Sequence, residues 1–178
     1  FIDNATGFAI EKNTFEKAQG ARPDNYIGVR IKNPQATDEV YKNDFEGLSY
    51  GNFSEGENWE GSTFTGLTYY CNDNTNNYAD FYVCGETTNY DNPGIQSKQG
   101  DEELPAGNTF SPSGATWHFY NGGSYLVDYY YCDNCTNENP EDDKILNVLD
   151  TATTIENPCP SHYGGGEDER KVTLTSEE

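Results

Sequence analysis

Short stretches of alternating apolar and polar residues recur along the chain and predict β-strands. In residues 26–32 the side chains of Ile27, Val29 and Ile31 share one face. Further strands are predicted at residues 63–71, 79–84, 115–120, 124–131, 144–150 and 171–175. Helical periodicity is scarce, and we recognise no internal repeat. The pattern therefore predicts an all-β protein with minimal helix.

Two pairs of these segments are predicted to form antiparallel hairpins. Residues 115–120 and 124–131 flank Asn121-Gly122-Gly123, which supplies the positive φ angles of a tight turn. Residues 63–71 and 79–84 flank an Asn-rich loop. Short strands with Gly- and Asn-rich turns favour an antiparallel β-sandwich or jelly-roll-like domain with extended terminal strands.

The chain of 178 residues suits one domain with appended segments. Residues 1–20 predict an N-terminal extension with a donor strand and a short helix, which Asn13 would cap and which would run over residues 14–19. Residues 21–163 predict the β-sandwich, and residues 164–178 a segment linked through three glycines. The apolar stretches are far shorter than the ~18 residues that span a bilayer, so no membrane span is predicted.

The composition is aromatic and strongly acidic. There are 14 Tyr, 9 Phe and 2 Trp, so Tyr and Phe must fill much of the core while other rings lie at sheet faces or interfaces. The 31 acidic residues against 10 basic ones give a net charge of −21. Such a charge repels phosphate backbones, which excludes a nucleic-acid partner.

The five cysteines favour an oxidising, extracellular or cell-surface location. Cys71 and Cys84 flank the predicted hairpin loop, so we expect a disulfide between them. One of Cys132 and Cys135 then pairs with Cys159, with Cys135–Cys159 favoured, and the remaining thiol is free or bridges to another molecule. The alternative is a zinc site, because the two CxxC and CxxH turns supply four ligands: Cys132, Cys135, Cys159 and His162.

Two further kinds of site are candidates. The loop at residues 72–80 offers oxygen ligands for calcium from Asp73, Asn77 and Asp80, with a solvated Asn-rich turn as the competing interpretation. Apart from calcium or zinc, no cofactor is predicted. N-x-S/T sequons make Asn4, Asn52 and Asn134 candidate glycosylation sites.

The sequence contains no GxSxG elbow, HExxH helix, P-loop or GxGxxG turn, so we expect no enzymatic activity. The leading hypothesis is an extracellular structural or adhesive surface protein that self-associates into a homopolymer, as the subunit of a pilus-like filament assembled by β-strand complementation. An apolar terminal strand carrying Phe1, Ile2, Phe8 and Ile10 would complete the sheet of a neighbouring subunit.

The alternative hypothesis is a monomeric, secreted, lectin-like module that binds a glycan. Exposed Tyr and Trp side chains, among them Trp117 and Tyr130, would stack on sugar rings. A flat row of such rings also suits a subunit interface, where Tyr and Trp are enriched.

Overall fold

The computed structural model describes residues 1–18, 26–34, 36–60, 65–84, 94–123, 125–162 and the backbone of 170–174. Within these residues there is no α-helix, and a single 3-10 turn spans Asp142–Lys144. The protein is all-β, as predicted. Nearly all strand pairs in this part of the chain are parallel, so the antiparallel sandwich or jelly roll is wrong; among these pairs only β8 and β9 run antiparallel.

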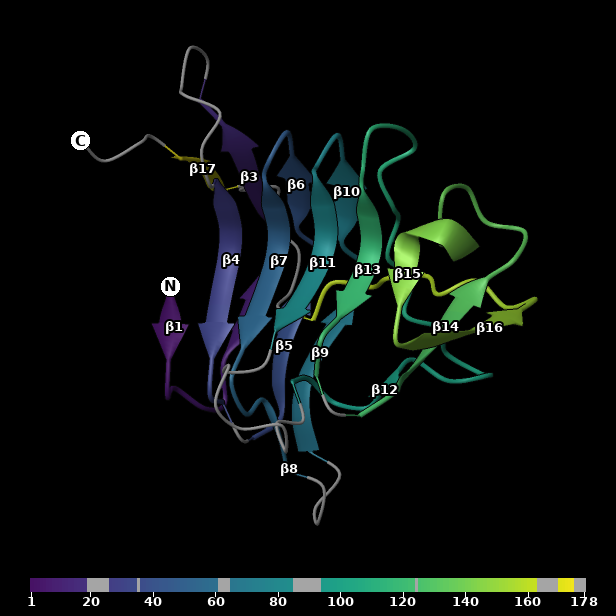
Figure 1. Cartoon of the computed structure of the whole chain (residues 1–178), viewed down its shortest axis with the longest axis horizontal. Helices are drawn as coiled ribbons and strands as arrows, with labels where there is room; N and C mark the ends of the chain where they lie inside the picture. Colours follow the sequence, from purple (N-terminus) through teal and green to yellow (C-terminus); the bar gives the residue numbers. More distant parts are fainter. Residues whose placement is uncertain are drawn as a thin grey trace.

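The strands form four sheets (Figure 1). Sheet I has the order β1 (Ile2–Asp3), β4 (Ile27–Lys32), β7 (Tyr50–Glu55), β11 (Ala79–Cys84), β13 (Trp117–Asn121) and β15 (Ile145–Leu146). Sheet II has the order β2 (Ala9–Glu11), β5 (Asp38–Tyr41), β9 (Thr65–Tyr70) and β8 (Trp59–Glu60). Sheet III has the order β10 (Asp73–Thr75), β6 (Asp44–Glu46), β3 (Asn13–Lys17) and β17 (Arg170–Leu174). Sheet IV has the order β12 (Lys98–Gln99), β14 (Val127–Cys132) and β16 (Val148–Thr153).

Successive strands of the chain visit these sheets in a fixed rotation. β2, β3 and β4 lie in sheets II, III and I, and the same order recurs for β5, β6 and β7 and again for β9, β10 and β11. We call each such circuit a coil. Each coil pairs with the next, so that Val40 lies beside Ile10 and Tyr69, and Phe45 lies beside Phe15. The chain therefore stacks coil on coil as solenoid proteins do, with an internal repeat that the sequence analysis missed.

The turn that follows the sheet II strand of each coil, and one later turn, carry the same two-residue pattern. A residue with positive φ precedes an asparagine in Lys12-Asn13, Lys42-Asn43, Cys71-Asn72 and Gly107-Asn108. The carboxamide oxygen of each asparagine accepts the backbone N–H of the asparagine one coil earlier, over 3.0, 3.1 and 2.9 Å along the series. This asparagine ladder satisfies backbone groups that would otherwise be buried without partners.

Aromatic side chains fill much of the space inside the coils. Tyr69, Tyr129, Phe45, Phe81, Phe110 and Phe119 are among the largest fully buried side chains. Two of the buried tyrosines keep partners for their hydroxyls: Tyr69 bonds Ser54, and Tyr129 accepts from the Asn108 amide at 3.5 Å. Along β14, Tyr129 and Tyr131 are buried and Tyr130 is not, as strand alternation predicts.

The predicted strand positions agree with the structure better than the predicted partners do. β9 pairs with β5, and β13 pairs with β11 and β15, so neither hairpin forms. The predicted helix over residues 14–19 is also wrong, because residues 14–17 lie in strand β3. Phe15 is buried there and stacks on Phe45 of the next coil with ring centroids 5.0 Å apart.

The segments predicted to be appendages are paired within the chain. β1 pairs with β4 and β2 with β5, while β17 runs beside β3 at the edge of sheet III (Figure 1). The glycine joint and residues 175–178 lie outside the described residues. In the described part of the chain, no helix is long and apolar enough to cross a membrane.

Candidate functional site

The outer face of sheet I presents side chains in register across its strands. Arg30, Phe53, Tyr82 and Tyr120 occupy equivalent positions on β4, β7, β11 and β13. The flanking residues Asn52, Ser54, Phe81, Val83, Phe119 and Asn121 are buried, so the four side chains point away from the core. Parallel pairing holds such residues about 4.8 Å apart, close enough for their rings to stack.

These rings lie face to face. Tyr82 and Tyr120 stack at 4.5 Å with 8° between their planes, and Phe53 and Tyr82 at 5.6 Å with 11°. The Arg30 guanidinium lies 5.6 Å from the centre of the Phe53 ring. Burial, together with the nearby Tyr120 and Tyr50 hydroxyls, raises the pKa of Tyr82 to about 12. Phe53 and Tyr120 cover the two faces of the Tyr82 ring, so the stack stabilises the sheet. The edges of the rings are left to contact a partner.

Three further rings adjoin the stack at one end of the strands. Tyr50 meets the Tyr82 ring at 4.9 Å and 60°, and Trp117 meets Tyr120 at 5.4 Å and 63°. Tyr78, which is 51% exposed, meets Tyr50 edge-on at 6.4 Å. Among the described residues, no other ring stacks face to face on these three. We call Tyr50, Tyr78 and Trp117 the aromatic platform.

The two predicted glycan-binding residues lie apart. Trp117 belongs to the platform on sheet I, whereas Tyr130 lies on β14 in sheet IV, with Lys98 Nζ 5.2 Å from the centre of its ring. The rest of the platform was missed as a set. Strand alternation gives no signal for it, because Tyr50 has the same parity along β7 as the buried Asn52 and Ser54. Tyr78 precedes β11, and only the coil register, which pairs Tyr50 and Trp117 with Ala79, brings the set together.

The predicted calcium ligands do not converge. Asp73 is exposed and accepts the Thr109 hydroxyl at 2.9 Å. Asn77 and Asp80 are buried, and the Asn77 amide donates to Asp80 Oδ1 at 3.1 Å. An amide N–H directed at the carboxylate occupies the place that a cation would take, so the loop at residues 72–80 gives no support for calcium.

A buried Asp–Ser–His group lies next to this position. Asp80 accepts both the Ser111 hydroxyl at 2.6 Å and the Ser111 backbone N–H at 2.8 Å, while burial raises its pKa to about 6. His118 Nε2 lies 3.1 Å from the Ser111 carbonyl oxygen, and His118 Nδ1 accepts the Glu141 N–H at 3.1 Å. Because the imidazole keeps no nitrogen for the serine hydroxyl, this group is not a nucleophilic triad.

The cysteines pair differently from the prediction. Cys71 bonds Cys159, Cys132 bonds Cys135, and Cys84 forms no disulfide. The predicted Cys71–Cys84 and Cys135–Cys159 pairs are wrong because Cys71 does not lie opposite Cys84 in a hairpin. Cys84 ends β11 on sheet I, next to Glu55 of β7. The two disulfides are typical of an oxidising compartment.

The predicted four-ligand zinc site is not assembled either, since the sulfurs of Cys132, Cys135 and Cys159 are all in disulfides. His162 instead contacts sheet II. Its ring stacks on Tyr41 at 4.0 Å, and Nδ1 lies 3.2 Å from Glu39 Oε2. Glu11 accepts the Ser161 hydroxyl at 2.8 Å, so this segment is held against the coils.

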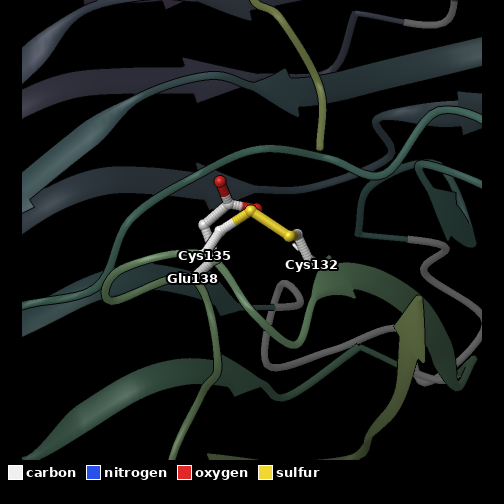
Figure 2. A group of neighbouring side chains, drawn as sticks. All are labelled: Cys132, Cys135 and Glu138. Atoms are coloured by element: carbon white, nitrogen blue, oxygen red, sulfur yellow. Dashed lines mark hydrogen bonds between the residues drawn. A yellow bond between two sulfur atoms is a disulfide. The ribbon is translucent and has the colours of Figure 1, made fainter. Parts of the chain in front are cut away.

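A different trio gathers at the end of β14. Figure 2 shows the Glu138 carboxyl group beside the Cys132–Cys135 disulfide, and the potential ligand atoms of the three residues lie within 4.8 Å of one another. Glu138 is buried, and its pKa is raised first by burial and then by Glu156 and Asp73. Glu138 was not singled out from the sequence, although its spacing after the CxxC turn was visible.

The remaining predicted sites are the sequons and the assembly strand, and their residues differ in exposure. Asn4 and Asn134 are exposed, but Asn52 is 1% exposed and inaccessible to glycosylation in the folded protein. Of the predicted assembly strand, Phe1 is 75% exposed beneath the Arg30 guanidinium. Ile2, Phe8 and Ile10 are partly buried and pack against the chain's own core.

Comparison with known proteins found no matching family model, no similar curated protein and no similar solved structure.

Proposed function

We propose that this protein is an extracellular, adhesive surface protein in which the stacked coils are a rigid scaffold and the aromatic platform binds a neutral glycan. The observation that carries the proposal is the grouping of Tyr50, Tyr78 and Trp117 on one outer face. Tyr50 of β7 and Trp117 of β13 are in register with Ala79 of β11, which Tyr78 directly precedes. The Phe53–Tyr82–Tyr120 stack supports Tyr50 and Trp117 from the side.

Two physical arguments support a sugar as the ligand. A saccharide ring presents apolar C–H edges that pack on aromatic faces, and rigid Tyr and Trp side chains lose little conformational entropy on binding. The net charge of −21 repels polyanionic glycans, which leaves neutral polysaccharides as the class that the surface suits.

The test is binding of soluble neutral glucans and mannans, with heparin as the polyanionic comparison. Trp117→Ala and Tyr50→Ala should each weaken binding at least tenfold, a loss of about 1.4 kcal/mol that is typical of an aromatic anchor. Tyr125→Ala is the matched control because Tyr125 is 50% exposed and contacts Trp59, outside the platform. The proposal fails if no neutral glycan binds, or if the control weakens binding as much as Trp117→Ala does.

Self-association is the second candidate function, and exposed leucines on outermost strands favour it. Leu146 lies on β15 and Leu149 on β16, the edge strands of sheets I and IV, and both side chains are exposed. Insertion of residues 1–10 into a neighbouring subunit is less favoured, because Ile2, Phe8 and Ile10 already pack against the core of their own chain. An edge-to-edge contact with a second copy would need no such release.

Light scattering over a concentration series tests this second candidate. Association through these strands should be lost in Leu149→Glu and kept in Leu104→Glu, since Leu104 is equally exposed but lies outside β15 and β16. A monomer at all concentrations, or equal loss in both variants, would exclude it.

A further inference from the structure

The Cys132–Cys135–Glu138 cluster brings three potential metal ligands to one point. Its two sulfurs and the Glu138 carboxylate lie within 4.8 Å of one another, at the end of β14 and in the turn that follows it (Figure 2). Two thiolates and one carboxylate are a donor set suited to zinc and to other thiophilic divalent ions.

The backbone holds this cluster together without help from the S–S bond. The Cys135 N–H donates to the Cys132 carbonyl at 3.2 Å, which closes the turn. The Cys132 N–H reaches Glu138 Oε2 at 3.3 Å and so orients the carboxylate toward the sulfurs. The Asp133 N–H donates to the Thr153 carbonyl at 2.9 Å, which ties the turn to β16. A reduced cluster therefore keeps its ligands close together.

We propose that reduction of the Cys132–Cys135 disulfide converts this cluster into a binding site for a thiophilic divalent cation such as Zn²⁺ or Cd²⁺. A dithiol reductant supplies two electrons and two protons. The Cys132–Cys135 bond breaks, two thiols form, and the reductant closes to its own disulfide. When the cation binds, each thiol releases its proton to the buffer, and the cation takes two thiolates and the Glu138 carboxylate as ligands.

The surroundings of the cluster suit both steps. Cys135 is partly exposed whereas Cys132 is 2% exposed, so a reductant reaches the disulfide at Cys135. Asp73 and Glu156 lie near Glu138, and among the described residues no Lys or Arg forms an ion pair with it. The local potential is therefore negative, which attracts a cation.

The second disulfide keeps the fold closed while the first is reduced. Cys71–Cys159 joins positions 88 residues apart and lies against Gly107. Loss of Cys132–Cys135 leaves the six-residue pairing of β14 with β16 in place, from Val127 beside Val148 to Cys132 beside Thr153. We therefore expect a folded protein with a reduced, metal-competent turn.

The experiment titrates Cd²⁺ into the full chain after limited reduction by dithiothreitol and anaerobic removal of the reductant. Cys84→Ser is the background for every variant, because it removes the one cysteine that forms no disulfide. Thiol alkylation with mass spectrometry identifies which cysteines were reduced. In the reduced protein we expect a thiolate-to-metal charge-transfer band that saturates at one Cd²⁺ ion per chain. In the oxidised protein we expect no such band.

Three variants decide the outcome. Cys135→Ser should abolish the band, and Glu138→Gln should weaken Cd²⁺ affinity at least tenfold while the fully loaded band persists. Asp3→Asn, at an exposed carboxylate on β1, an edge strand of sheet I, should change affinity less than twofold. The proposal is overturned if reduced protein shows no saturable band, if Cys135→Ser keeps it, or if Glu138→Gln binds as tightly as the background protein. The glycan proposal is independent of each of these results.

Discussion

Replacement of Asn72 by Ala tests whether the asparagine ladder stabilises the coil stack. The Asn72 carboxamide accepts the Asn43 backbone N–H at 3.1 Å and donates to the Val40 carbonyl at 2.9 Å, and the residue is fully buried. Asn72→Ala leaves these two backbone groups buried without their side-chain partner. At about 1–3 kcal/mol for each group, the free energy of unfolding should fall by about 2–6 kcal/mol.

Asn13→Ala is the matched control within the ladder. Asn13 lies in the first coil, is partly exposed, and its amide donates to Asn43 Oδ1 and to the Glu11 carbonyl. Water can replace those bonds, so its loss should cost at most about 1 kcal/mol. Urea unfolding followed by circular dichroism measures both variants beside Asn134→Ala, an exposed asparagine outside the ladder. Equal costs for Asn72→Ala and Asn13→Ala would refute the idea that the ladder stabilises the stack.

Three further predictions concern the disulfides, the pH dependence and the core. Cys71→Ala/Cys159→Ala should lower the free energy of unfolding by about 4–5 kcal/mol and Cys132→Ala/Cys135→Ala by only about 1–2 kcal/mol, because the first bond closes a far longer loop; equal losses in urea unfolding would contradict this. Burial raises the pKa of Asp80 to about 6. Its contribution to the free energy of unfolding, up to about 3 kcal/mol, is therefore fully present below about pH 4 and is lost as pH rises through 6. Burial lowers the pKa of His118, so the stability contributed by its neutral imidazole is lost as pH falls below 6.5. The difference between the stability profiles of the wild type and of Asp80→Asn therefore isolates the aspartate, and a flat difference would contradict the assignment. Phe119→Ala should cost about 3–5 kcal/mol in the same urea assay, as expected for a fully buried ring, and a cost below about 1 kcal/mol would show that the site collapses around the cavity.

The local alternation of apolar and polar residues was enough to place most strands in the sequence, but it did not predict which strands pair with each other. Alternation identifies the buried faces of β4 and β14, since Val29 and Ile31 are inside and Tyr130 is not. Asn- and Gly-rich turns, however, serve a hairpin and a solenoid corner equally well, because both need positive φ angles. Only the spacing between similar turns distinguishes them. Lys12-Asn13, Lys42-Asn43, Cys71-Asn72 and Gly107-Asn108 carry that signal in the sequence.

The candidate sites depended on the coil register and were therefore less accessible to sequence reasoning. Cys71 reaches Cys159 only because Gly107 lies at the ladder turn between them. A Cβ atom at Gly107 would lie 3.1 Å from Cys159 Sγ and 3.3 Å from Cys71 Sγ. The platform residue Trp117 was singled out, but its neighbours Tyr50 and Tyr78 come from different coils and share no local motif with it.

The Cys71–Cys159 bond also determines how the protein responds to mechanical load. A pull applied at the two ends of the chain passes through the disulfide and bypasses the 88-residue segment that it closes. That segment corresponds to about 300 Å of extended polypeptide, which bears no load until the bond is reduced. Under such a load the bond limits extension to the residues outside this segment. Strands β10 to β16 lie inside this segment, with Tyr78 and Trp117 among its residues, so the force does not extend them while the bond is intact.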